Sequence, residues 1–214
     1  MSEPYYSDEH VTLYLGSCVE EGAWLDADVL ITDPPYGIAY TSGQMGGTNP
    51  DTVVGDESAD IRDEALGLWG DRPAAVFGSW RVDRPSGVRH RLIWHKRSRL
   101  PGFTKAPWFP VEEEIYILGS GWSGKPSANV IATDEQRDGA KGYVATIGHP
   151  TPKPVGLMEQ IIAKAPEGVI ADPFAGSGST LLAARNLGRR SIGVEIEERY
   201  CDLIASRLSQ GVLL

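Results

Sequence analysis

The stretch GVIADPFAGSGSTLLAARNLG, residues 168–188, decides the fold that we expect for this chain. A short apolar run ends in Asp172, a turn rich in glycine and serine follows, and an Ala/Leu-rich run predicts a helix. Glycines allow a tight turn and a close approach of the backbone to a ligand, while a helix N-terminus presents unpaired N–H groups. We therefore predict a strand–turn–helix unit that binds a nucleotide-type cofactor, with a purely structural unit as the alternative.

The residues around this turn narrow the kind of cofactor. The lysine of the P-loop pattern G-x-x-x-x-G-K-[ST] is absent, and Gly176-Ser-Gly178 does not continue into the dinucleotide pattern G-x-G-x-x-G. A second apolar strand then ends in Glu195, and an acid at this place in such a unit is positioned to hydrogen-bond a ribose. An acid for a ribose, without a lysine for phosphates, favours an adenosine cofactor that lacks phosphates.

The rest of the chain continues the alternation of strands and helices. Several of its short segments consist almost entirely of apolar residues, which is typical of the strands of a parallel sheet covered on both faces. Three further segments carry helical patterns, in addition to the helix after the glycine turn. The sequence thus predicts a doubly wound α/β fold. The expected strands are 11–16, 29–32, 74–78, 91–95, 114–118, 168–171 and 191–195, and the expected helices are 62–69, 154–164, 179–187 and 198–209.

The segment VLITDPPYGIAY, residues 29–40, is the second informative stretch. Its apolar strand runs into Asp33, and Pro34 and Pro35 then stiffen the backbone, because proline fixes its own φ and donates no hydrogen bond. Tyr36 adds an aromatic ring at the tip of the loop. We interpret this rigid loop as a candidate catalytic site, and a Pro-Pro turn with a satisfied Asp is the structural alternative.

Length and composition are those of a globular protein. The 214 residues, 41% hydrophobic and 23% charged, fit one domain spanning 1–214 with a substantial core. Two cysteines, Cys18 and Cys201, suggest no disulfide framework. The first ten residues lack the basic and apolar regions of a signal peptide, and no apolar run reaches the length of a membrane span. We therefore expect a cytoplasmic protein without contact to a membrane.

The distribution of charge matters more than the net charge of −9. Residues 81–105 hold eight Lys/Arg against one Asp, whereas residues 1–80 hold 15 acids and two bases. A concentrated basic segment in an acidic chain is a candidate footprint for nucleic acid, and a solvated charged loop is the alternative. The residues that we expect to contact phosphates are Arg89, Arg91, Lys96, Arg97, Arg99 and Lys105.

The sequence contains four motifs in this order: DPPY (33–36), HPTPKP (149–154), DPFAGSGST (172–180) and GVEIEERY (193–200). Together they resemble the motifs of the β-class DNA amino-methyltransferases, which use S-adenosylmethionine. LYLGSC (13–18) and RLIWHK (91–96) extend the similarity over nearly the whole chain. The resemblance implies a mostly parallel, seven-stranded methyltransferase sheet with one antiparallel strand. The motif order implies a circular permutation, with the catalytic half first and the cofactor half last.

The resemblance also implies ligands and roles. The cofactor would be S-adenosylmethionine, with S-adenosylhomocysteine as product and no metal, and the partner would be double-stranded DNA. The implied catalytic residues are Asp33, Pro34, Pro35 and Tyr36. The implied cofactor-binding residues are His149, Thr151, Lys153 and Pro154 over the methionine moiety, Asp172, Phe174, Gly176, Gly178 and Ser179 along it, Glu195 at the ribose and Ile196 at the adenine.

The DPPY loop suits an exocyclic amine of a base. The lone pair of adenine N6 is delocalised into the ring, so the amine must pyramidalise before it attacks a methyl group. Asp33 and a carbonyl of Pro34 or Pro35 can accept its two hydrogens and favour that geometry, which is positioning more than base catalysis. Tyr36 offers a stacking face for a base flipped out of the duplex.

Several alternatives stay open at this point. Cytosine N4 has the same amine chemistry as adenine N6, a catalytically idle nucleic-acid-binding relative would keep the fold, and an amine of RNA or protein is a third target. Segment 120–148 is expected to be a short target-recognition insertion, and its sequence preference cannot be deduced. A homodimer stays open, as does an origin in a bacterium or in a phage or mobile element acting in host cytoplasm.

Overall fold

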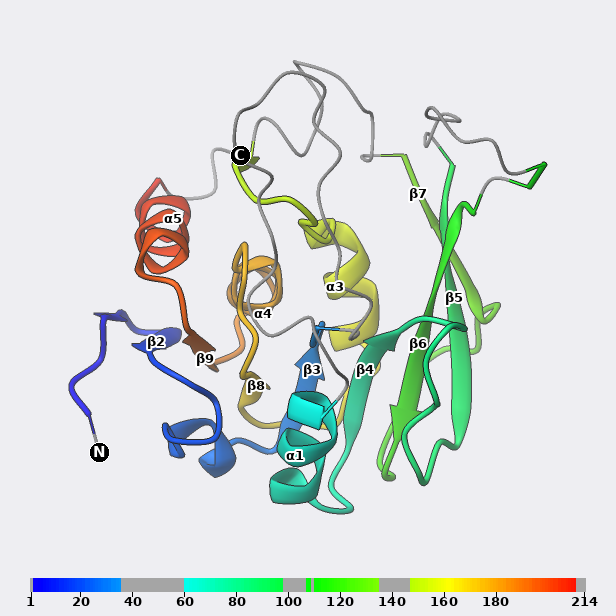
Figure 1. Ribbon diagram of the computed structural model, residues 1–214, viewed down its shortest axis with the longest axis horizontal. Helices are drawn as coiled ribbons and strands as arrows, with labels where there is room; N and C mark the ends of the chain where they lie inside the picture. The colour runs from blue at the N-terminus through cyan, green and yellow to red at the C-terminus, as the bar shows by residue number, and fades with distance from the viewer. Residues whose placement is uncertain (1, 36–59, 98–106, 109, 135–146, 211–214) are drawn as a thin grey trace.

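The computed structural model describes residues 2–35, 60–97, 107–108, 110–134 and 147–210. Within these ranges the chain forms one sheet in the order β1-β2-β9-β8-β3-β4-β6-β5-β7 (Figure 1). Its strands are β1 Tyr6–Ser7, β2 Val11–Leu15, β3 Val29–Thr32, β4 Ala74–Gly78, β5 His90–Lys96, β6 Glu112–Leu118, β7 Val130–Thr133, β8 Ile170–Asp172 and β9 Ser191–Glu195.

Helices cover both faces of the sheet, because side chains of the inner strands alternate between two apolar cores. On β3, Val29 and Ile31 pack in the core that contains α3 and α4, whereas Leu30 packs in the core that contains α1. A third core joins β2 to α5. This layering confirms the predicted doubly wound α/β fold. The helices are η1 Ala23–Asp26, α1 Asp60–Trp69, α3 Val155–Ile162, α4 Ser179–Asn186 and α5 Glu198–Ser209.

The expected seven-stranded sheet with one antiparallel strand forms the centre, in the order β2-β9-β8-β3-β4-β6-β5. Within it, β6 is antiparallel to both neighbours, β4 and β5, and the remaining pairs are parallel. Two edge strands were not predicted: β1, of two residues, pairs with β2, and β7 pairs with β5. β7, with the sequence VIAT, lies within the described part of segment 120–148.

The sheet has a switch point between β3 and β8. These parallel neighbours pair Val29 with Ile170, and Leu30 with Ala171. From β8 the chain passes through α4 to β9 on one side, whereas α1 leads into β4 on the other side (Figure 1). Ligands of open α/β sheets bind in the crevice outside the carboxyl ends of the strands at such a point. The fold therefore predicts a site where Asp33 and Asp172 end their strands.

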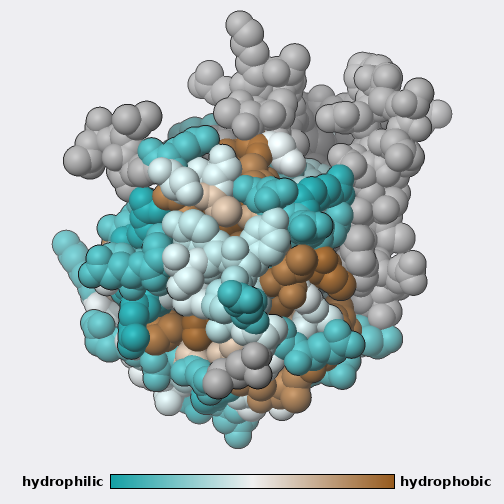
Figure 2. All heavy atoms as spheres, turned by 90° about the vertical axis from the view of Figure 1, so that its left-hand side faces the viewer, coloured by the Kyte–Doolittle hydropathy of each residue, from teal (hydrophilic) through white to brown (hydrophobic). Residues whose placement is uncertain are grey.

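The homodimer stays a prediction. Figure 2 shows hydrophobic side chains in several separate patches, divided by hydrophilic ones, on the face that it presents. None of the helices in the described ranges combines the length and hydrophobicity needed to cross a bilayer.

Candidate active site

A cavity of about 470 Å³ opens at the carboxyl edge of the sheet, within the size range of small-molecule sites. Three acids that each end or follow a buried strand line it: Asp33 after β3, Asp172 on β8 and Glu195 on β9. In parallel strands these ends share one edge, so residues far apart in the sequence meet. The sheet itself therefore brings the DPPY loop and the glycine turn into one site.

The two glycines of the turn before α4 stand where a side chain would be crowded. Gly176 has a φ of +50°, and a Cβ there would lie 3.1 Å from Nε2 of His149. Gly178 has a φ of +75°, and a Cβ there would lie 2.9 Å from Ile204. Positive φ is strained for other residues, so both positions call for glycine. The result is a backbone cradle on the floor of the cavity.

Glu195 is buried and locked to this cradle. Its Oε2 accepts a hydrogen bond from the N–H of Gly176 at 2.7 Å, and its Oε1 accepts one from the N–H of Glu197 at 2.9 Å. Burial raises the pKa of the Glu195 carboxyl, although these backbone N–H groups act in the opposite direction. Beside it, Ile196 is 53% exposed and lines the cavity with its apolar side chain.

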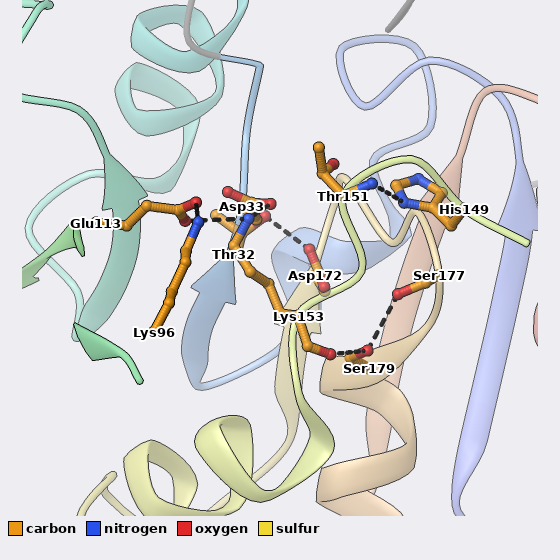
Figure 3. Close-up of polar contacts among 10 residues, drawn as sticks. All are labelled: Thr32, Asp33, Lys96, Glu113, His149, Thr151, Lys153, Asp172, Ser177 and Ser179. Carbon is orange, nitrogen blue, oxygen red and sulfur yellow. Dashed lines mark hydrogen bonds and ion pairs between the residues drawn. The ribbon is translucent and has the colours of Figure 1, made fainter. Parts of the chain in front are cut away.

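The HPTPKP segment lies against the same turn. The Ser179 hydroxyl donates to the backbone carbonyl of Lys153 at 2.6 Å, and the N–H of Thr151 donates to Nδ1 of His149 at 3.2 Å (Figure 3). The His149 ring contacts the ring of Tyr200, with 4.5 Å between centroids. The segment is therefore fixed over the start of α4 before it enters α3.

Asp172 joins the two halves of the site. Its Oδ1 accepts a hydrogen bond from the Thr32 hydroxyl at 2.6 Å and one from the N–H of Phe174 at 3.2 Å. Burial raises the pKa of Asp172 to about 7, and these hydrogen bonds only partly offset it. The bond to Thr32 ties β8 to β3 at the switch point.

An ion-pair network occupies the Asp33 side of the cavity. The Lys153 ammonium pairs with Oδ2 of Asp33 and lies 3.3 Å from Oε2 of Glu113. The Lys96 ammonium pairs with the other oxygen of Glu113 (Figure 3). Burial acts to raise the pKa of Glu113, but the two ammonium groups outweigh it and lower this pKa. Burial likewise acts to lower the pKa of Lys153, and the two carboxylates outweigh it and raise this pKa.

The structure gathers most of the predicted site residues. Pro34 and Pro35 line the cavity beside Asp33, and Tyr36 lies outside the described residues. Two of the predicted cofactor residues do not line it, because Pro154 caps α3 and Gly178 caps α4. The others that line the cavity are His149, Thr151, Lys153, Asp172, Phe174, Gly176, Ser179, Glu195 and Ile196.

Strand β5 lies within the basic segment 81–105, and its charged residues differ in exposure and in partners. Lys96 is a correction to the predicted phosphate contacts: its side chain is buried and its ammonium pairs with Glu113 inside the cavity. Arg97, at the same end of β5, is exposed and lies 3.7 Å from Asp134. Arg91 is half-exposed and pairs with Glu114 at 2.7 Å, and Arg89 is exposed before the other end of β5. Arg99 and Lys105 lie outside the described residues.

Two cavity residues, Glu113 and Trp80, were missed by the sequence analysis. Trp80 is 69% exposed and lines the cavity, and Arg81 lies over its ring at 5.4 Å. It follows β4, the neighbour of β3, so the rule that strand ends share an edge could have identified it. In the part of the chain that the structure describes, no group of three or more His, Cys, Asp or Glu residues is arranged to hold a metal.

Comparisons with known proteins agree on one family. The profile of the N6/N4 DNA methylases matches residues 80–206. Type II methyltransferase M.ScaI of Streptomyces caespitosus is 43% identical, and the match covers 97% of this chain and 84% of that protein. Two solved structures share the fold. The M1.HpyAVI–SAM complex has a TM-score of 0.61 at 22% identity, covering 92% of this chain and 99% of the other. PvuII DNA methyltransferase, named cytosine-N4-specific, has a TM-score of 0.66 at 18% identity, covering 95% and 88%.

Proposed function

Because the chain belongs to the N6/N4 DNA methylase family, an S-adenosylmethionine-dependent family, we propose that it methylates the exocyclic N6 of adenine in double-stranded DNA. The observation that supports this assignment most is the meeting of Asp33, Pro34 and Pro35 with the glycine cradle and Glu195 in one cavity. One part of the cavity suits an amine, and the other suits an adenosine cofactor.

The residues of the cradle fit S-adenosylmethionine. A Cβ at Gly176, which lines the cavity, would fill space at the turn, so a ligand can approach the backbone closely there. Glu195 offers carboxylate oxygens at the place expected for ribose hydroxyls, and Ile196 offers an apolar surface for adenine. The turn 172–180 lacks the lysine with which a P-loop binds phosphates. When bound, S-adenosylmethionine supplies an electrophilic methyl group on a positively charged sulfur.

Asp33 and the prolines would act on the amine. The Asp33 carboxylate accepts one N–H hydrogen, and a carbonyl of Pro34 or Pro35 accepts the other, so that the nitrogen lone pair points away from both. The rigid Pro-Pro backbone keeps this carbonyl aimed, which lowers the entropy cost of reaching the reactive geometry. The chain would contribute orientation and electrostatics, and Asp33 would take up the proton released by the product amine.

The target base has to leave the duplex to reach this cavity. Trp80 at the rim and Tyr36 in the DPPY loop would provide stacking surfaces, and Arg89, Arg91 and Arg97 would contact phosphates. We assign target recognition to segment 120–148, of which β7 is the described strand, with residues 135–146 outside the described ranges.

The proposal is tested by expressing the protein in a bacterial host that lacks DNA methylation and analysing the digested DNA by mass spectrometry. N6-methyladenine is the expected product, and sequencing of the modified DNA gives the recognition sequence. N4-methylcytosine would move the assignment to cytosine, since the amine chemistry is shared. Unmodified DNA from cells that hold folded, S-adenosylmethionine-binding protein would contradict the proposed activity and favour the idle relative.

Trp80→Ala is expected to weaken binding of the flipped base by about 1–3 kcal/mol, the usual contribution of one base–aromatic stack, and Trp80→Phe should retain most of it. The measurement uses a duplex with 2-aminopurine at the methylated position, whose fluorescence reports flipping. Trp108→Ala is the matched control, because Trp108 is 84% exposed and does not line the cavity. Equal losses in both variants would remove Trp80 from the base pocket.

Neutralising the exposed arginines of the basic segment should weaken binding to all DNA sequences alike. Each lost phosphate contact lowers the slope of log affinity against log salt by about 0.9. Arg89→Ala, Arg91→Ala and Arg97→Ala are measured singly, because β5 separates Arg89 from Arg97 by roughly 26 Å. Arg190→Ala is the control: this exposed arginine precedes β9 and lies outside the basic segment. Unchanged slopes in all three variants would show that the segment is solvated surface.

A further inference from the structure

The Lys153 ammonium lies between two carboxylates that come from different strands. Asp33 follows β3, and Glu113 lies on β6, so the lysine spans the site from the segment before α3 (Figure 3). Lys153 is only 5% exposed. Its backbone carbonyl is engaged separately by the Ser179 hydroxyl, which fixes the start of the side chain. Both ends of this lysine are therefore held.

The surroundings strengthen these ion pairs. The Lys153 ammonium lies 5.2 Å from the ring centroid of Phe77 and 5.9 Å from that of Trp94, so aromatic rings replace water around it. Lys96 pairs with the Glu113 oxygen that does not face Lys153. Negative and positive charges therefore alternate in the order Asp33, Lys153, Glu113 and Lys96. Buried pairs are screened much less than surface pairs, so each charge in this series constrains the next.

We propose that Lys153, supported by the Glu113–Lys96 pair, is a positioning residue that holds the Asp33 carboxylate ionised and oriented toward the target amine. An ammonium on one carboxylate oxygen restricts rotation of the group and favours its charged, accepting form. The inference rests on the proposed function of Asp33. It reassigns Lys153 from the methionine side of the cofactor, where the sequence resemblance placed it, to the amine side.

Lys153→Met tests the assignment by separating turnover from cofactor binding. A misplaced carboxylate should lower kcat by about 10²-fold, with the affinity for S-adenosylmethionine unchanged in calorimetry. Lys164→Met, a lysine just beyond α3 whose ammonium donates to the carbonyl of Lys125, is the control. A loss of cofactor affinity with kcat retained would overturn the proposal. If Lys153→Met does not fold, Lys153→Gln carries the same comparison, since it removes the charge and keeps N–H donors.

The pH–rate profile gives a second readout that a purely structural role would not move. Without the ammonium, Asp33 should accept a proton more easily, so the acid limb of the profile should move to higher pH. The charged or titratable groups around Asp33 include Lys153, Glu113, Lys96 and Asp172. Asp172 and the other two are intact in the variant, so a shift is assigned to Lys153. An unshifted acid limb would contradict the proposal.

The support from Glu113 is tested with a charge-balanced change. Lys96→Met combined with Glu113→Gln removes one cation and one anion, so the net charge of the network stays the same and folding is protected. We expect kcat to fall in the same direction as in Lys153→Met, by a smaller factor. An unchanged kcat would show that Lys153 positions Asp33 without this pair and would overturn that part of the proposal.

An experiment without DNA separates this inference from the proposed function. In protein with 13C-labelled lysine, NMR titration of Lys153 should show a lower pKa in Asp33→Asn than in the unmutated chain, because Asp33 contributes to its raised pKa. An unchanged Lys153 titration would overturn the pairing, whatever base the enzyme methylates. If the pKa falls and no DNA base is methylated, the pairing stands and only the proposed function fails.

Discussion

Replacing Asp33 by Asn is expected to slow methyl transfer by about 10²–10³-fold, the usual cost of removing one preorganised electrostatic contact to a transition state. The amide is nearly isosteric with the carboxylate but has only one accepting oxygen. Lys153 pairs with Oδ2 of Asp33 and would draw that oxygen toward itself. The NH₂ group would then face the target amine, where it donates instead of accepting. The lone pair of the amine would lose its orientation.

The affinity for S-adenosylmethionine should hardly change in Asp33→Asn, because Glu195 and the glycine cradle are untouched. The measurements are single-turnover methylation at saturating DNA and calorimetry with the cofactor. Asp63→Asn is the matched control, since the Asp63 side chain is 59% exposed on α1. Methylation at the unmutated rate in folded Asp33→Asn would exclude Asp33 from the chemistry, and with it the role we propose for the DPPY loop.

The meeting of the two halves of the site was predictable because it follows from the fold. Asp33, Asp172 and Glu195 each stand where an apolar run stops, and such runs become neighbouring parallel strands. Parallel strands end at one edge, so the order of the motifs along the chain did not matter. The turn at Gly176 was predictable for a similar local reason, since only glycine tolerates its backbone angle beside His149.

The ion-pair network was not predictable from the positions of charges along the chain. Lys96 belongs to a basic run, yet it shares a face of β5 with the buried Trp94 two residues earlier, and this period of two could have shown that it points inward. Glu113 is paired in register with Trp94 on the same face. Its third partner, Lys153, comes from a distant segment, and only the packing of α3 against the sheet brings it there. A count of charges along the sequence does not distinguish residues on the buried face of a strand from those on its exposed face.

Glu195→Ala is expected to weaken S-adenosylmethionine binding by about 1.5–3 kcal/mol, the usual value of a hydrogen bond to a charged group. Two effects of this change add up. The ribose would lose its acceptor, and the N–H groups of Gly176 and Glu197 would lose the carboxylate that fixes the cradle. Calorimetry measures the loss, and Glu198→Ala is the control, because Glu198 is an exposed acid in the first turn of α5.

A cofactor product without its ribose 2′-hydroxyl separates the two effects. If Glu195 contacts the ribose, 2′-deoxy-S-adenosylhomocysteine should bind the unmutated protein more weakly than S-adenosylhomocysteine does, and Glu195→Ala should bind both alike, because the lost partner makes the hydroxyl irrelevant. If Glu195 only braces the turn, both ligands lose the same free energy in the variant and the difference between them persists. Unchanged affinity for both would remove Glu195 from the site. Equal affinity of the unmutated protein for ATP or NAD would contradict the proposed fit to S-adenosylmethionine, since the turn lacks the lysine with which a P-loop binds phosphates.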